Sequence, residues 1–114
     1  MSYEINPHHD FLLEAKKLKK RYPSFESDLE DFKDSLQKNP FQGTELFPGI
    51  RKIRMSIKSK GRGKAGSARV ITANAIIAEH EGRIALLALY DKADYSTVDV
   101  KIIRQMARDL GFNV

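Results

Sequence analysis

Three segments, ARVITANAIIA at residues 68–78, EG at 81–82 and RIALLALY at 83–90, predict the centre of the fold. The first and third are rich in apolar and β-branched residues, as strands are, and an acidic residue followed by glycine is typical of a hairpin turn. Because residues 84–89 are apolar without interruption, we expect a central strand that is covered on both faces. Together the segments predict an antiparallel hairpin in the middle of a sheet.

Shorter patterns indicate two further strands and two loops. Residues 52–58 alternate between apolar and polar side chains, which predicts a half-buried strand. Residues 3–5 are consistent with a short first strand. Residues 39–49 contain two prolines and two glycines, and residues 59–67 contain three glycines and three basic residues, so both stretches are predicted to be loops.

Two helices are expected before residue 40. Asn6 is suited to cap a helix that begins at Pro7 and ends near Arg21. Ser24 can cap a second helix, which Pro40 stops. Because the link between the helices is short, they are predicted to pack as an antiparallel hairpin. The apolar stripe of the second helix consists of Phe25, Leu29, Phe32 and Leu36.

A last helix is expected near the C-terminal end, where Ser96 and Asp99 have the spacing of a capping box. The element order is then β-α-α-β-β-β-α, which belongs to the α+β class. We expect one domain over residues 1–114, with the N-terminal helical hairpin packed on a curled antiparallel sheet and the helices on one face. The stripe of the C-terminal helix that should face the core consists of Val98, Ile102, Met106 and Leu110.

Composition limits the functional classes. The sequence has no cysteine, which excludes disulfides, thiolate nucleophiles and cysteine-ligated zinc. No apolar run approaches the roughly 20 residues needed to cross a bilayer. The first residues lack the basic and apolar segments of a signal peptide, so we expect a cytoplasmic protein without a membrane partner.

Charge is distributed unevenly along the chain, which carries a formal net charge of +5. Residues 47–78 contain eight basic and no acidic residues, whereas the remainder of the sequence sums to −3. A basic strip on a mildly acidic body predicts a polyanionic partner, in the first place nucleic acid. The alternative is a solvated, lysine-rich edge that prevents aggregation.

Three local motifs resemble one protein family. They are KIR at residues 52–54, GRGKAGSARVI at 61–71 and LYDK at 89–92. Together with the predicted element order, they resemble the RelE/ParE toxin superfamily of type II toxin–antitoxin systems, and in particular its HigB branch. That branch often has Ser where Ala65 stands and Gly where Ser67 stands, so the basic loop is expected to be tuned differently here.

The resemblance implies a ribosome-dependent endoribonuclease that enters the ribosomal A site, cuts mRNA and is silenced by a cognate antitoxin covering its basic face. No cofactor and no metal are expected. The candidate catalytic residues are Arg54, Arg69, Tyr90 and Lys92, and the candidate RNA- and ribosome-binding residues are Lys52, Lys58, Lys60, Arg62 and Lys64.

Each candidate residue type suits a step of metal-free RNA cleavage. A guanidinium is always charged and can bind two phosphate oxygens, so Arg69, assisted by Arg54, would stabilise the phosphorane. Lys92, among other cations, would act as base or acid. Tyr90 would stack on a base or orient the 2′-hydroxyl. The lysines around the loop would anchor phosphates.

Less specific roles remain open for the same residues. Arg69 could form a structural salt bridge, Tyr90 could be a packed side chain, and Lys92 and the loop lysines could simply be solvated. A gyrase-blocking toxin of the ParE type, or a non-catalytic RNA- or ribosome-binding protein, could use the same scaffold. A metal at His8, His9 and Asp10 is not expected, because adjacent helical residues do not face one site.

Overall fold

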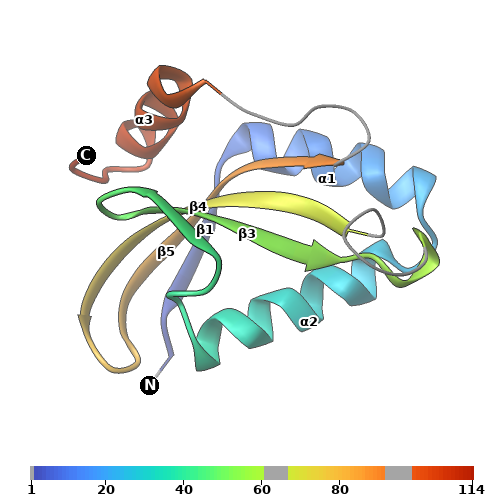
Figure 1. Cartoon of the computed structure of the whole chain (residues 1–114), viewed down its shortest axis with the longest axis horizontal. Helices are drawn as coiled ribbons and strands as arrows, with labels where there is room; N and C mark the ends of the chain where they lie inside the picture. The colour runs from blue at the N-terminus through green and yellow to red at the C-terminus, as the bar shows by residue number, and fades with distance from the viewer. Residues whose placement is uncertain (1, 61–66, 92–98) are drawn as a thin grey trace.

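The computed structural model describes residues 2–60, 67–91 and 99–114, which form three helices and a five-stranded sheet with one short 3-10 helix (Figure 1). The α+β class predicted from the sequence is confirmed. In chain order the elements are β1 (Glu4–Pro7), α1 (His9–Arg21), α2 (Phe25–Lys38), β2 (Thr44–Phe47), β3 (Ile50–Ser56), the 3-10 helix η1 (Lys58–Lys60), β4 (Ser67–Ala78), β5 (Glu81–Asp91) and α3 (Val100–Asp109).

The strands lie in the order β1-β5-β4-β3-β2, which places β5 and β4 at the centre as predicted. The neighbours β5-β4, β4-β3 and β3-β2 are antiparallel. Strand β1 instead pairs with β5 in parallel, with Ile5 opposite Ile84, so the prediction of a wholly antiparallel sheet is wrong at this edge. A parallel pairing is possible because α1, α2 and three strands separate β1 from β5 in the chain, and no tight hairpin constrains their direction.

Helices cover both faces of the sheet, which corrects the prediction that all helices lie on one face (Figure 1). Helices α1 and α2 pack on the face that carries Ile84 and Leu86 of β5. Helix α3 packs on the face that carries Ala85 and Leu87. The uninterrupted apolar run of β5 supplies both faces, because successive side chains of a strand point to opposite sides.

The start of α1 differs from the prediction. Pro7 is the last residue of β1, opposite Leu86, and His8 rather than Asn6 is the N-cap. The Nδ1 atom of His8 accepts a hydrogen bond from the backbone N–H of Asp10 at 3.0 Å. The Nε2 atom therefore carries the proton and donates to Oδ2 of Asp109 at 3.1 Å. Hydrogen bonds from Gln105 and from His8 lower the pKa of Asp109.

Two elements lie where loops were predicted. Residues 44–47 form the edge strand β2, with Thr44 opposite Lys52, and residues 58–60 form η1. The four residues of β2 are mostly exposed, so they lack the apolar alternation by which a strand is recognised. An edge strand of only four residues also offers little backbone for pairing with other chains.

The helical stripes are partly as predicted. Phe25, Phe32 and Leu36 of α2 are buried. In α3, which begins at Val100 behind the N-cap Asp99, the buried residues are Ile103, Met106 and Ala107. Ile102 is 60% exposed, so the predicted stripe is wrong at that position, and Ser96 and Val98 lie outside the described residues. No helix in the described ranges has the length and apolar character to cross a membrane.

Replacement of Leu36 tests whether α2 packs on the core of the protein. Its side chain is fully buried between α2 and the sheet, so Leu36→Ala is expected to lower the free energy of unfolding by about 2–5 kcal/mol. Leu12→Ala, at an exposed position of α1, is expected to change it by less than about 0.5 kcal/mol. Urea denaturation followed by circular dichroism measures both, and equal effects would contradict this packing.

Candidate nucleic-acid interface

Three of the four candidate catalytic residues lie in one row across the sheet. Arg54 of β3 is directly opposite Arg69 of β4, and Arg69 is directly opposite Tyr90 of β5. Residues that lie opposite one another on neighbouring strands point to the same face and are about 5 Å apart. The pairing register therefore brings together residues that are up to 36 positions apart in the sequence. This row lies on the face that α3 partly covers.

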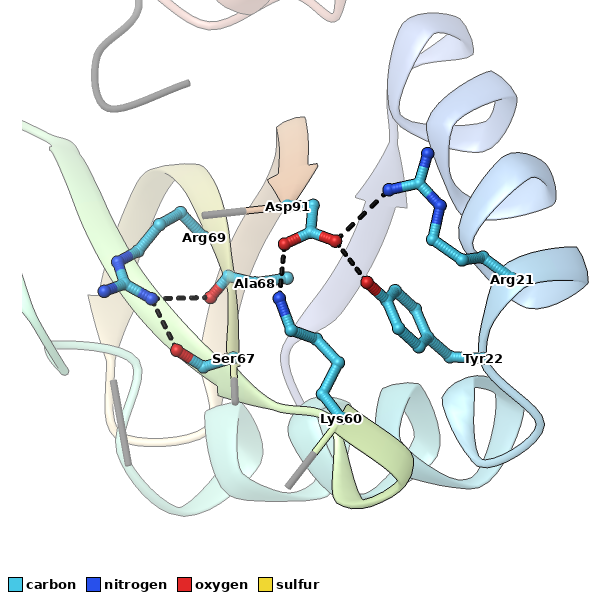
Figure 2. Close-up of polar contacts among 7 residues, drawn as sticks. All are labelled: Arg21, Tyr22, Lys60, Ser67, Ala68, Arg69 and Asp91. Atoms are coloured by element: carbon cyan, nitrogen blue, oxygen red, sulfur yellow. Dashed lines mark hydrogen bonds and ion pairs between the residues drawn. The ribbon is translucent and has the colours of Figure 1, made fainter. Parts of the chain in front are cut away.

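Arg69 is 9% exposed as a residue, and its guanidinium is held from one side (Figure 2). Its Nη1 atom donates to Oγ of Ser67 at 2.6 Å and to the carbonyl oxygen of Ala68 at 3.3 Å. Within the described ranges, no carboxylate forms an ion pair with Arg69. Among the described residues its positive charge is therefore compensated by neutral acceptors, and the structural salt bridge considered from the sequence is not found among them.

A hollow of about 370 Å³ opens beside the row. Arg69, Arg54 and Lys52 line it together with the segment 42–44. Arg54 is exposed and Lys52 is half-buried, and neither forms an ion pair with any residue that the structure describes. Three positive charges without a paired acid converge on one hollow, which favours an anionic ligand.

The segment 42–44, which also lines the hollow, depends on Gly43 and on hydrogen bonds from Arg51. Gly43 has φ +74°, and a Cβ there would stand 2.2 Å from the carbonyl oxygen of Lys52, so only glycine fits. Arg51 donates from Nε to the carbonyl oxygen of Gln42 at 2.7 Å and from Nη2 to that of Gly43 at 3.2 Å. The segment 42–44 is thus held against β3 by main-chain acceptors.

Sequence reasoning missed Gln42, Thr44 and Ser67 as parts of this site. Ser67 was detectable, because residues two apart on a strand share a face and Ser67 precedes Arg69 by two. Gln42 and Thr44 were not detectable, since their placement depends on β2 pairing with β3.

A second polar cluster surrounds the buried carboxylate of Asp91, which is 1% exposed (Figure 2). Its Oδ1 atom pairs with Nζ of Lys60, and its Oδ2 atom accepts from Nη1 of Arg21 at 3.2 Å and from the hydroxyl of Tyr22 at 2.5 Å. The Lys60 ammonium also lies 5.6 Å from the centre of the Tyr22 ring. The cluster joins the ends of α1, η1 and β5.

This cluster changes the role expected of Lys60. The sequence placed Lys60 in a solvated loop as a phosphate anchor, but its side chain is nearly buried against Asp91. Lys58 is exposed and lies 3.5 Å from Asp31, on the side of α2. Of the remaining predicted residues, Arg62, Lys64 and Lys92 lie outside the described ranges.

Tyr90 is buried, at 2% exposure, and packs in the same cluster as Ile103 and Met106 of α3. A ring enclosed in this way has no face available for a nucleic-acid base, so the stacking role expected for Tyr90 does not fit its position. Among the described residues, no group of three His, Asp or Glu side chains is arranged to hold a metal ion.

Comparison with known proteins identifies the fold. No family model and no curated protein matches the sequence. Among solved structures, the chain is similar to the Escherichia coli toxin RelE, in the free state of a mutant with two arginines replaced by alanine. The TM-score is 0.57 at 13% sequence identity, over 96% of this chain and 99% of the other. The chain therefore has a RelE-like fold, and the resemblance to the HigB branch stays a prediction.

The buried ion pair at Asp91 can be tested by stability. Asp91→Ala would leave the Lys60 ammonium buried without its carboxylate, so we expect the free energy of unfolding to fall by about 3–5 kcal/mol. The matched control is Asp31→Ala, which breaks the exposed pair with Lys58 and should cost less than about 1 kcal/mol. Chemical denaturation measures the free energy of unfolding of both variants. Equal decreases for Asp91→Ala and Asp31→Ala would contradict the buried cluster.

Proposed function

We propose that this protein is the toxin of a type II toxin–antitoxin system, and that it cuts mRNA on the ribosome in the cytoplasm without a metal. The observation that carries the proposal is the group of three cations, Lys52, Arg54 and Arg69, which line one hollow without a paired acid among the described residues. The RelE-like fold supports the proposal, since the similar solved protein is described as a toxin.

The chemistry proposed for the hollow is electrostatic. During cleavage the 2′-hydroxyl attacks the phosphorus, and negative charge builds up on the non-bridging oxygens. Arg69 keeps three N–H donors, one on Nε and two on Nη2, that have no acceptor in the described part of the chain. These donors can bind two phosphate oxygens at once, and Arg54, directly opposite on β3, can bind the next phosphate or the same one.

Proton transfer requires another group. Arginine does not lose its proton in proteins, and the described part of the row contains neither histidine nor carboxylate. In our proposal, Lys92 serves as base or acid, as the resemblance to the HigB branch implies. Lys92 itself lies outside the described residues, and the sequence predicts that it continues the strand parity of Tyr90, two residues earlier.

Binding without cleavage is the second candidate. It is favoured by the burial of Tyr90 and by the absence of a general base from the described residues of the row. In that case the same cations would hold RNA or the ribosome in place, and translation would be blocked by occupancy alone. The two candidates differ in one observable, the appearance of new mRNA ends.

We also propose a protein inhibitor, the cognate antitoxin. Exposed apolar side chains are available for it at Leu12 and Leu13 on α1 and at Ile102 on α3. Burying such side chains against a partner is favourable by about 1.5–3 kcal/mol for each one that becomes fully covered.

The central residue of the proposal is tested by Arg69→Ala. We expect this variant to lose growth arrest in cells at equal expression, because the main group that binds phosphate is gone. Primer extension should show new mRNA ends with the wild type and none with the variant. Arg108→Ala, at an exposed position of α3, should retain both effects.

Other outcomes identify the alternatives. Growth arrest that depends on Arg69 without new mRNA ends would favour binding without cleavage. Inhibition of gyrase supercoiling by the purified protein would favour the gyrase-blocking function instead. Full toxicity of Arg69→Ala, with intact mRNA cleavage, would refute the proposed site.

The electrostatic contribution of the other two cations is tested by salt dependence. Lys52→Gln with Arg54→Gln should weaken binding to single-stranded RNA and lower the slope of log affinity against log salt by about 0.7 for each phosphate that the protein no longer neutralises. Fluorescence anisotropy between about 50 and about 200 mM salt measures the slope. Lys17→Gln with Lys20→Gln removes the same charge from α1, on the other side of the sheet, and an equal change there would argue against the hollow.

A further inference from the structure

Ser67 holds one nitrogen of the Arg69 side chain from within the same strand. The two residues are two positions apart on β4 and therefore point to the same face. The Ser67 side chain is fully buried, and its Oγ accepts from Nη1 of Arg69 at 2.6 Å. The Ala68 carbonyl oxygen accepts from the same Nη1 at 3.3 Å. One end of the guanidinium is thus occupied by protein acceptors (Figure 2).

The occupied end determines which edge of the guanidinium remains available. Both hydrogens of Nη1 have acceptors in Ser67 and Ala68, whereas Nε and Nη2 of Arg69 have none among the described residues. The Nε and Nη2 donors form the side edge of the group, which matches two oxygens of a phosphate. Arg69 lines the hollow together with Lys52 and Arg54. The edge left without protein acceptors is therefore the part of Arg69 that can serve an anion bound there.

We infer that Ser67 is a positioning residue, which holds Nη1 of Arg69 so that the Nε and Nη2 edge binds the scissile phosphate of RNA. The inference rests on the proposed function, because it assigns a role within the same site. Ser67 touches Arg69 rather than the substrate, and its effect passes through the guanidinium. A hydrogen bond to a charged group is stronger than one between neutral groups, and a pre-oriented side chain loses less freedom on binding.

The residue type at position 67 supports this role. Arg69 is a largely buried residue, and a buried charge is costly unless it is hydrogen-bonded. The hydroxyl of Ser67 supplies such a hydrogen bond to Arg69 from within the same strand.

The test compares Ser67→Ala with Ser67→Thr and with a neighbouring control. Ser56→Ala changes the serine directly opposite Ser67 on β3, whose side chain is exposed and is not bonded to Arg69. The probe is a short fluorescein-labelled single-stranded RNA, measured by anisotropy over a range of salt. Thermal unfolding of each variant reports whether the fold is retained.

We expect Ser67→Ala to weaken RNA binding about tenfold, the size expected for one hydrogen bond to a charged group, and to lower the salt slope by about 0.7. Ser67→Thr, which keeps a hydroxyl, and Ser56→Ala should stay within about threefold of the wild type. In an Arg69→Ala background, Ser67→Ala should have no further effect, because a residue that acts through Arg69 has nothing left to position.

The double variant makes the outcomes distinguishable. If Arg69→Ala weakens RNA binding and Ser67→Ala does not, the positioning role is refuted and the proposed site stands. If Ser67→Ala is equally harmful with and without Arg69, or lowers thermal stability with an unchanged salt slope, Ser67 is structural only. If Arg69→Ala leaves RNA binding unchanged, both the positioning role and the proposed function are refuted.

Discussion

Strand β5 is paired along both edges and covered on both faces, and this position constrains the rest of the molecule. Its alternate side chains must fit two different layers, α1 with α2 on one side and α3 on the other. A shift of one residue in its pairing would exchange the two sets, so the register is strongly specified. The same register places Tyr90 opposite Arg69 and, through β4, aligns Arg69 with Arg54. The candidate site is therefore a consequence of how the core packs.

The register also keeps a buried carboxylate away from the cations. Asp91 follows Tyr90 directly and lies opposite Ala68, so its side chain points to the face of α1 and α2. There Lys60, Arg21 and Tyr22 satisfy it. On the other face, Arg69 has only neutral acceptors among the described residues. Asp91 and Arg69 are offset by one position in the pairing of β4 with β5, so their side chains lie on opposite faces of the sheet. The carboxylate is thus kept away from the cations that line the hollow.

Periodicity predicted the parts of this arrangement that depend on local patterns. The alternation in residues 52–58 and the apolar run in residues 84–89 identified β3 and β5. Arg54 and Arg69 were expected on neighbouring strands, but their direct alignment is set by the pairing register of β3 and β4. The parallel pairing of β1, the second helical layer of α3 and the burial of Lys60 were not predicted. Each depends on a tertiary partner far away in the sequence. Lys60 illustrates the point, because a lysine in a glycine-rich basic stretch gives no sign of a carboxylate 31 residues later.

The charged hollow and the exposed apolar side chains suit two different ligands, nucleic-acid phosphates and a protein partner. The hollow beside Arg69 is lined mainly by cationic and small polar residues, which suits phosphate groups better than an apolar partner. Leu12 and Leu13 are exposed on α1, which packs on the opposite face of the sheet, whereas Phe41 and Leu46 are exposed at the β2 edge. A protein partner that buried Leu12 and Leu13 would leave the hollow open. A partner could cover the hollow directly by binding at the β2 edge, where Phe41 and Leu46 are exposed, or beside α3, where Ile102 is exposed. The position of an inhibitor on this fold therefore determines whether it competes with RNA or acts from a distance.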